Sequence, residues 1–413
     1  MPMMQSALRG KGRSNNIDLA LLAYWGILVF WQNINPGSTG STADTLIKTG
    51  LIVFLAGYYI LHAEPFGRRS VLLMLAFALS MSLSFVAEST FSLRMLLTYF
   101  FPVAFAFCAF CPGGNFQINK KRLLRFMYAI ILIVLYMALY ALIATPQKFF
   151  SALSASSAYG NELTSFFASN HEYGLYLMAG IVACLVCIEM DGQKGFWKKL
   201  LFFVAIPLFL ANLVLTYSRT AMLATVLIFA ACVFLNHKSR FAKLLLIGFI
   251  VVAAVVAAVP ALHEYFLKIV LKDNNLAGRD ELASLAMDTF KNGAFFEKIW
   301  GQGASATASF FREETDHASV HNAYLQVLLY FGISGLFAMV SVLLLQLRGA
   351  FWLIKRDRFL GVIQIGLVFA CASMMLTNTA VLFSSPIDSY FLTMFTIVVP
   401  RYVGNAVQMG EFN

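Results

Sequence analysis

Runs of about 20 apolar residues recur along most of this chain, and they restrict its fold more than any other feature. A run of that length crosses a lipid bilayer as one helix. Of the 413 residues, 60% are hydrophobic and only 12% are charged. An average soluble domain is about 25% charged, so this chain lacks the polar surface that a soluble globule of its length needs. We therefore expect an all-α polytopic membrane protein.

The apolar runs predict about 12 transmembrane helices. Their expected positions are residues 17–33, 46–62, 70–87, 94–111, 125–144, 173–189, 199–217, 220–236, 241–260, 323–347, 359–377 and 385–401. On this reading residues 1–260 hold spans 1–9, and residues 261–322 form a long loop. Residues 323–413 hold spans 10–12 and the C-terminus.

The basic residues predict the orientation of the spans. Of the 30 Lys and Arg residues, 20 fall in segments on one side of the predicted spans, 4 fall in short loops on the other side, and 6 fall in the long loop. Short cytoplasmic loops carry the excess of Lys and Arg, so both termini are expected in the cytoplasm and the long loop in the periplasm. This bias accounts for the net charge of +10 without nucleic acid as a partner.

The long loop is expected to be partly helical. The stretch "GRDELASLAMDTFKNG" has apolar residues at helical spacing, two acidic residues in its first turn and a glycine to end it. The stretch "IWGQGASATASFF" after it is predicted to be loop. Ordered loops of this length are commonly functional.

The six cysteines include two pairs with CxxC spacing, "CAFC" and "CLVC". Both pairs lie inside apolar runs and have no further ligands near them. They are expected to be small buried thiols that pack between helices rather than a zinc site.

Arg219 stands between two apolar runs with almost no loop, in "LANLVLTYSRTAMLATVLIF". An arginine at such a hairpin either extends its charged end to the membrane surface or faces a cavity and binds an anion. Its planar guanidinium suits bidentate binding of a phosphate.

Arg279 follows Gly278 at the start of the helix predicted in the long loop. A helix N-terminus together with an arginine favours a phosphate. The alternative is a solvated residue that pairs with Asp280 or Glu281.

His321 precedes "NAYLQVLLYFGISG", at the expected periplasmic end of a span. A histidine that is neutral near pH 7 is the usual general base, and the alternative is a hydrogen-bonding anchor at the membrane surface. His317 lies four residues earlier and would share one helical face with it. No HExxH pattern or third ligand accompanies the two histidines, so no metal is expected.

Together the two arginines and the histidine suit a reaction on a phosphate-bearing lipid, because the charge bias places all three on one side of the membrane. The arginines would hold a pyrophosphate leaving group and the histidine would take a proton from an acceptor hydroxyl. No phosphate loop of the Walker type is present.

At this point the chain resembles the bacterial superfamily of O-antigen ligases and O-antigen polymerases, which are membrane glycosyltransferases. The motifs that carry the resemblance are "YSRTAML", "GRDELASLAMDTF", "WGQG" and "HNAYLQVLLYFGISG", in that order along the chain. The resemblance implies an inverting, metal-independent and cofactor-free transfer of a glycan from undecaprenyl pyrophosphate at the periplasmic face of the inner membrane.

The resemblance also implies residue roles. Arg219 and Arg279 would contact the pyrophosphate, and His321 would be the general base or would orient the acceptor. Asn322 would orient the histidine, and His317 joins the candidates for substrate binding. In "FFASNHEYG", Asn170, with His171 and Glu172, would line the same cavity, or would cap the helix locally.

The superfamily divides by acceptor, and the chemistry is common to both branches. A polymerase moves the growing glycan onto the non-reducing end of a new lipid-linked repeat, and a ligase moves it onto lipid A–core. The forms "SRTA" and "HNAYLQVLLYFGISG" are slightly closer to polymerases for O-antigen, capsule or exopolysaccharide. Ligases, including ligases of protein O-glycans, are the alternative. Beside the membrane lipid and these substrates, the resemblance implies a chain-length regulator as a partner.

Two other classes of function compete with a transferase. A transporter or flippase of lipid-linked sugars would also need arginines for pyrophosphate, but it would not need a long external loop that ends in a histidine. A structural scaffold would tolerate alanine at Arg219, Arg279 and His321.

Overall fold

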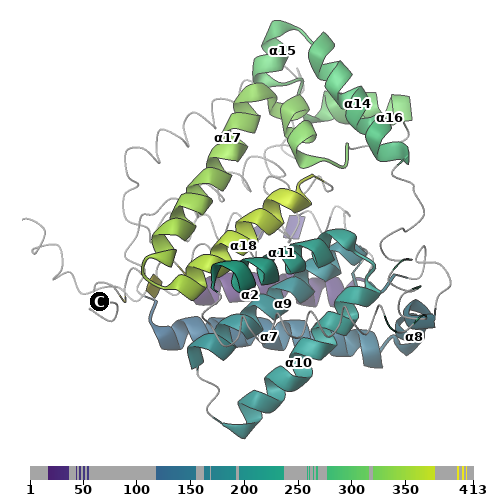
Figure 1. The fold of residues 1–413 in the computed structure, drawn as a ribbon. Helices are drawn as coiled ribbons and strands as arrows, with labels where there is room; N and C mark the ends of the chain where they lie inside the picture. The colour runs from purple at the N-terminus through teal and green to yellow at the C-terminus, as the bar shows by residue number, and fades with distance from the viewer. Residues whose placement is uncertain are drawn as a thin grey trace, which may run out of the picture.

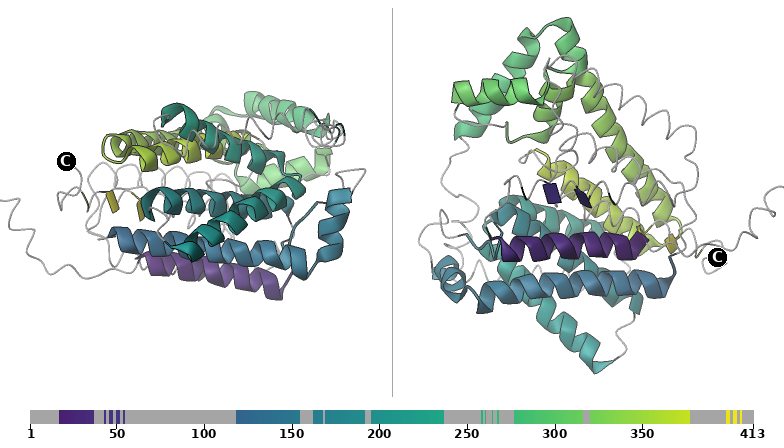
Figure 2. Two further views of the ribbon diagram at one scale, coloured as in Figure 1. Left: turned by 60° about the horizontal axis from the view of Figure 1, so that its bottom comes forward. Right: turned by 180° about the vertical axis from the view of Figure 1, so that it is seen from behind.

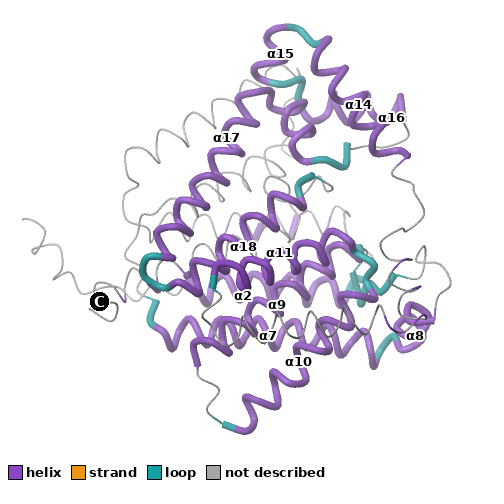
Figure 3. Tube along the Cα trace, in the orientation of Figure 1, coloured by secondary structure: helices purple, strands orange, loops and turns teal. Residues whose placement is uncertain are grey.

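The computed structural model describes residues 17–36, 118–154, 162–191 apart from residue 168, 195–236, 277–315 and 320–376, with isolated positions within 43–54, 258–267 and 398–406. All regular structure in these ranges is helical, and Figure 3 shows helices joined by short loops. The helices, in chain order, are α2 (Ile17–Ile34), α7 (Lys120–Ile143), α8 (Pro146–Ser154), α9 (Asn170–Asp191), α10 (Phe196–Leu215), α11 (Arg219–Leu235), α14 (Ala277–Asn292), α15 (Phe295–Trp300), α16 (Ala304–Thr315), α17 (Ala323–Ile354) and α18 (Arg358–Met374).

Helices α7, α9, α10 and α17 are each long and apolar enough to cross a membrane, and α2, α11 and α18 are shorter apolar helices. These seven helices confirm as helical the spans that the sequence predicts at their positions. The chain is thus a multi-pass membrane protein. The other predicted spans, and with them the count of 12 and the division into spans 1–9, loop and spans 10–12, lie wholly or mostly outside the described residues.

Helix α9 is the centre of the bundle. It packs against α7, α10 and α11, and the run from Glu172 to Cys187 is buried. Gly180 makes this close packing possible, since a Cβ there would lie 2.7 Å from Cγ1 of Val134 on α7 and 2.8 Å from the ring of Phe209 on α10. Small residues serve this purpose between membrane helices. Cys184 and Cys187 are buried free thiols in the same core, as expected from the sequence.

Helix α2 lies along α7, as both views in Figure 2 show. The contact is held at one end by an ion pair between Arg122 and Asp18, in which Nε of Arg122 donates to Oδ2 of Asp18 at 3.1 Å. The core is therefore one continuous cluster that runs from α2 through α7 and α9.

Helices α11 and α18 form an antiparallel pair. The guanidinium of Arg358, at the start of α18, donates twice to the carbonyl oxygen of Leu235, at the end of α11, at 2.8 and 2.9 Å. Midway along the pair, a Cβ on Gly366 would lie 2.9 Å from the Cα of Ile228. The start of α11 and the end of α18 must therefore lie at the same end of the bundle.

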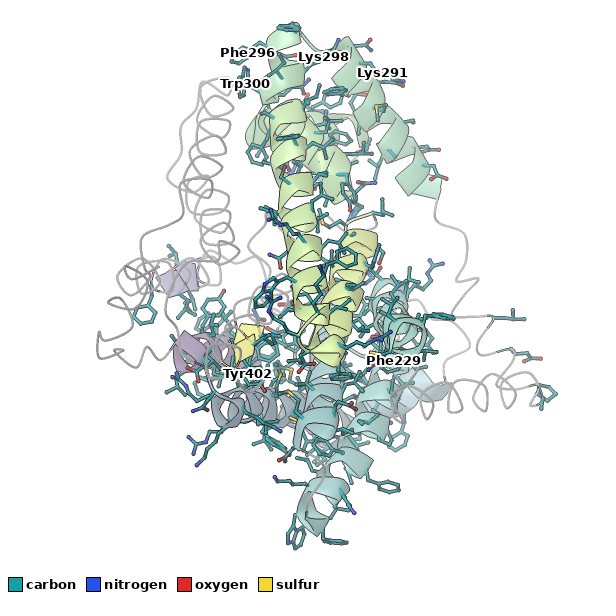
Figure 4. The ribbon with its side chains drawn as sticks, turned by 60° about the vertical axis from the view of Figure 1, so that its left-hand side comes forward. Phe229, Lys291, Phe296, Lys298, Trp300 and Tyr402 are labelled. Carbon is teal, nitrogen blue, oxygen red and sulfur yellow. The ribbon has the colours of Figure 1, made fainter. Side chains whose placement is uncertain are left out.

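Helices α14, α15 and α16 gather at one end of α17, away from α7 and α10 (Figure 1). Figure 4 shows Phe296 and Trp300 of α15 at this far end. Helix α14 confirms the helix predicted in the long loop, with Leu282 and Ala286 buried and the N–H of Gly293 bonded to the carbonyl of Thr289 at 3.0 Å.

The prediction that "IWGQGASATASFF" is loop was wrong. Residues up to Trp300 belong to α15, and α16 begins at Ala304. Ala304, Thr307 and Phe311 are 5%, 2% and 0% exposed, and their spacing places them on one helical face. The many small and hydroxyl residues hid this face in the sequence, so that only Gly301–Gly303 is loop.

Helix α17 is broken at Gly332, inside the span predicted at residues 323–347. Gly332 has φ 66° and ψ −164°, and Gly301 has φ 89° and ψ 169°, in a region that is essentially restricted to glycine. The two backbones meet here. The N–H groups of Gln302 and Gly303 donate to the carbonyls of Leu329 and Tyr330 at 2.8 and 3.3 Å. The motifs "WGQG" and "YFGISG" are thus one structural unit.

Replacement of Gly332 by alanine is expected to destabilise the protein by at least about 2 kcal/mol, because a Cβ there would lie 2.3 Å from the carbonyl oxygen of Ile299 and the backbone conformation excludes other residues. Gly349→Ala is the matched control within the same helix, since a Cβ at Gly349 meets nothing within 4 Å. That change should be neutral or stabilising. Thermal unfolding of the detergent-purified variants checks both, and an equal effect of the two changes would contradict the close contact.

Candidate functional site

The turn between α10 and α11 carries Arg219. Helix α10 ends at Leu215, Tyr217 takes a left-handed conformation with φ 52°, and Ser218 is the N-cap of α11, its Oγ accepting from the N–H of Ala221 at 3.4 Å. The segment from Leu215 to Ser218 is buried, whereas Arg219, the first residue of α11, is exposed. Arg219 therefore places an exposed cation directly after a buried turn.

The start of α9 is fixed on this turn. Nδ2 of Asn170 donates to the carbonyl of Thr216 at 2.9 Å, and Nδ1 of His171 lies 2.8 Å from Oγ of Ser218. Gly174 permits the approach, since a Cβ there would lie 2.8 Å from the Cβ of Ala221. The structure thus joins two sequence candidates, the "NHEYG" segment and the hairpin of Arg219. Asn170 acts here as a support of the turn.

Two further segments hold the same turn. The hydroxyl of Tyr217 donates to the carbonyl of Ala152 on α8 at 2.7 Å, and the N–H of Leu163 donates to the carbonyl of Leu215 at 3.0 Å. A residue other than glycine with positive φ costs energy and persists only where its surroundings hold it. These contacts provide that support, so the direction of the Arg219 backbone is well determined.

His321 stands at the entry of α17. It has φ 52°, and Asn322 is the N-cap, with its side-chain oxygen accepting from the N–H groups of Tyr324 and Leu325 at 3.0 and 3.2 Å. The side-chain oxygen of Asn322 therefore accepts hydrogen bonds from the helix, and its side-chain amide nitrogen can donate to a neighbouring group. The left-handed backbone turns the chain sharply at the histidine, which is partly exposed.

The entry of α17 is bonded to the end of α18. The N–H of Ala323 donates to the carbonyl of Met375 at 2.8 Å, and the hydroxyl of Tyr324 donates to the carbonyl of Ala372 at 2.9 Å. The end of α18 lies at the same end of the bundle as the start of α11. His321 and Arg219 therefore lie at one end of the bundle, together with the start of α9.

The two remaining candidates are less closely placed. Arg279 lies in the first turn of α14, which packs against α17, and its side chain is outside what the structure describes. His317 lies outside the described residues altogether.

Comparison of the sequence with known protein families supplies the decisive observation. Residues 202–340 match the family model described as O-antigen ligase, which is about a third of the chain. These residues belong to the O-antigen ligase and polymerase superfamily. The match begins in α10 and ends in α17, so it contains Arg219, Arg279, His317, His321 and Asn322. No curated protein matches the chain.

In this O-antigen ligase domain, the start of α11 is suited to an anion. The N-terminal N–H groups of a helix and its dipole favour negative charge, and Arg219 adds a formal positive charge at the same point. Within the described residues, no group of three His, Cys, Asp or Glu side chains is arranged to hold a metal ion. At this end of the bundle, the described candidates provide an exposed guanidinium at Arg219 and a partly exposed imidazole at His321.

The structural role of Tyr217 could not be predicted from the sequence. An aromatic residue with positive φ is not expected from any motif, and its hydroxyl bond to α8 joins residues far apart in the chain. Ser218 was visible as a polar neighbour of Arg219, and its contact with His171 emerges only in three dimensions.

The contact between His171 and Ser218 can be tested by a double-mutant cycle. Each single alanine substitution removes the interaction. The double variant His171→Ala/Ser218→Ala should therefore lose less free energy of unfolding than the sum of the two single losses, by about 1 kcal/mol, and thermal unfolding measures the difference. His171→Ala/Ser284→Ala is the control pair, since Ser284 is exposed and bonds only within α14. Additive effects in both pairs would contradict the contact.

Proposed function

We propose that this protein is a glycosyltransferase that moves a glycan from undecaprenyl pyrophosphate onto an acceptor hydroxyl at the periplasmic face of the inner membrane. The observation that carries the proposal is the presence of Arg219 and His321 at one end of the bundle, inside a domain of the O-antigen ligase family. The charge bias of the loops supports the cytoplasmic placement of the opposite end, and of both termini.

The proposed reaction uses these groups in defined roles. The acceptor oxygen would attack the anomeric carbon of the donor sugar as the bond from that carbon to the pyrophosphate oxygen breaks, with inversion. His321 would take the proton of the acceptor hydroxyl. Undecaprenyl pyrophosphate would leave with the electron pair, and Arg219 and the start of α11 would stabilise its growing charge. Arg279 would be a second contact to the pyrophosphate.

Other candidate residues would support this site. Asn170 would act by fixing the turn before Arg219, and Asn322 by fixing the entry of α17 beside His321. His317 would contact substrate from the segment that precedes this entry.

As acceptor we propose the non-reducing end of a new lipid-linked repeat, which makes the protein a surface-polysaccharide polymerase working with a chain-length regulator. The second candidate is a ligase that uses lipid A–core, and the family match supports both candidates equally. The family match gives no support to a transporter or flippase.

Arg219→Ala is expected to lower the transfer rate by about 100-fold or more, since it removes a cation that would act on developing charge. Arg219→Lys should retain an intermediate rate, because a lysine keeps the charge and loses the bidentate geometry. Arg312→Ala is the matched control, an exposed arginine on α16. Transfer measured in membranes with a lipid-linked glycan donor gives the rates. A wild-type rate in Arg219→Ala would exclude the proposed role.

The two acceptors are distinguished by deletion of the gene and complementation. Polymerase activity predicts a surface-glycan ladder reduced to core plus one repeat after deletion, whereas ligase activity predicts unmodified core with long glycan left on undecaprenyl pyrophosphate. Wild-type protein should restore the ladder and His321→Ala should fail to do so at equal expression. Full restoration by His321→Ala would identify the histidine as an anchor.

A further inference from the structure

A surface cavity of about 480 Å³, wide open to the surroundings, lies at the end of the bundle opposite to Arg219. It is formed where α7 begins, α9 ends and α10 begins. At the other end of the same helices, the hydroxyl of Tyr173 on α9 donates to Oδ1 of Asn212 on α10 at 2.8 Å, next to the turn of Arg219. Helix α9 alone has 22 residues, or about 33 Å, between the two ends. The cavity is thus separate from the candidate transfer site. Its lining residues are Lys120, Lys121, Leu124, Arg125, Tyr128, Asp191 and Lys198.

The cavity carries an excess of positive charge. Its one carboxylate, Asp191, accepts from the hydroxyl of Tyr128 at 2.8 Å and pairs with Nζ of Lys198 at 2.5 Å. Lys120 also lies close enough to Asp191 and to Asp357 for its charge to interact with both carboxylates. The lining still holds four cations and one carboxylate, so the excess of positive charge is centred on Lys121 and Arg125. Such an arrangement is suited to an anion with more than one oxygen.

The periodicity of α7 explains how a short basic run serves two purposes. Lys121, Arg125 and Tyr128 follow one another at four and three residues and so share one face of the helix. Arg122 points to another face, where it pairs with Asp18 of α2. The sequence "KKRLLR" therefore supplies one arginine for packing and directs the other cations to the cavity.

Exposed aromatic side chains near the cavity indicate how deep it lies in the membrane. Phe196 and Trp197, at the start of α10, are 71% and 78% exposed, and they immediately precede Lys198. Aromatic residues of this kind gather at the border between lipid tails and water. On α7, Leu132, Tyr136 and Leu139 are 58%, 47% and 36% exposed, and they continue the helical face of Lys121 and Arg125 along the helix beyond the cavity.

We propose that this cavity binds the phosphate headgroup of an anionic glycerophospholipid, from the leaflet that borders this end of the bundle. The basic side chains would contact the phosphate oxygens, and the acyl chains would lie against the exposed face of α7 that carries Leu132 and Leu139. Basic pockets between membrane helices at the headgroup level are suited to such lipids. The continuity between the cationic cavity and this apolar face favours a lipid over a free phosphate.

Titration of the purified full-length protein with phosphatidylglycerol, followed by native mass spectrometry, tests the proposal. Lys121→Ala/Arg125→Ala should weaken binding by about tenfold or more. Lys199→Ala/Lys355→Ala is the matched control. It removes the same charge from exposed positions at the same end, outside the cavity, and should change binding by less than about twofold. Phosphatidylcholine should bind more weakly than phosphatidylglycerol to the wild type.

Several results would overturn the proposal. Equal weakening in both double variants would indicate a general surface charge, and equal binding of phosphatidylcholine would remove the role of the anion. Displacement of the lipid by millimolar inorganic phosphate would indicate a site for a free anion instead. Size-exclusion profiles and thermal midpoints establish that each variant folds. If the double variant does not, Arg125→Gln alone should still weaken binding by about threefold, and an unchanged affinity would overturn the proposal.

Discussion

Backbone polar groups in apolar surroundings must find partners within the protein, and this constraint organises the described structure. Wherever a helix stops or breaks, another segment supplies the partner. At the break in α17, Gln302 and Gly303 donate to Leu329 and Tyr330. At the turn before α11, Asn170 donates to the carbonyl of Thr216, and at the entry of α17, Ala323 donates to Met375. Segments that are distant in the sequence are therefore joined where the helices end.

The same constraint places the candidate site. A helix terminus held by neighbouring segments has a defined direction, so a charged side chain at its first residue is presented at a fixed place. Arg219 is in this position on α11, and His321 directly precedes the cap of α17. Under the proposed function, these termini would combine N–H groups suited to an anion with the side chains that act on the substrate.

Much of the fold could be predicted from the sequence, because long apolar runs allow few alternatives in a membrane. The helices α2, α7, α9, α10, α11, α17 and α18 follow those runs. The prediction of a loop after Trp300 was wrong. The buried face of α16 consists of Ala304, Thr307 and Phe311, and these residues do not form a strong apolar pattern. Local patterns also gave Arg219 and His321 as candidates. Arg219 and His321 lie at the same end of the bundle because α11 pairs with α18, and no local sequence pattern predicts that pairing.

The proposed function requires Arg219 and His321 to face the same side of the membrane. The most direct measurement is labelling of single cysteines at these two positions, in a cysteine-free background, by a maleimide that does not cross the inner membrane. We expect Arg219→Cys and His321→Cys to react in cells whose outer membrane alone is permeabilised. Lys355→Cys, at the opposite end of α17, should react only after the inner membrane is opened. Labelling of positions 219 and 321 from opposite sides would contradict a common site.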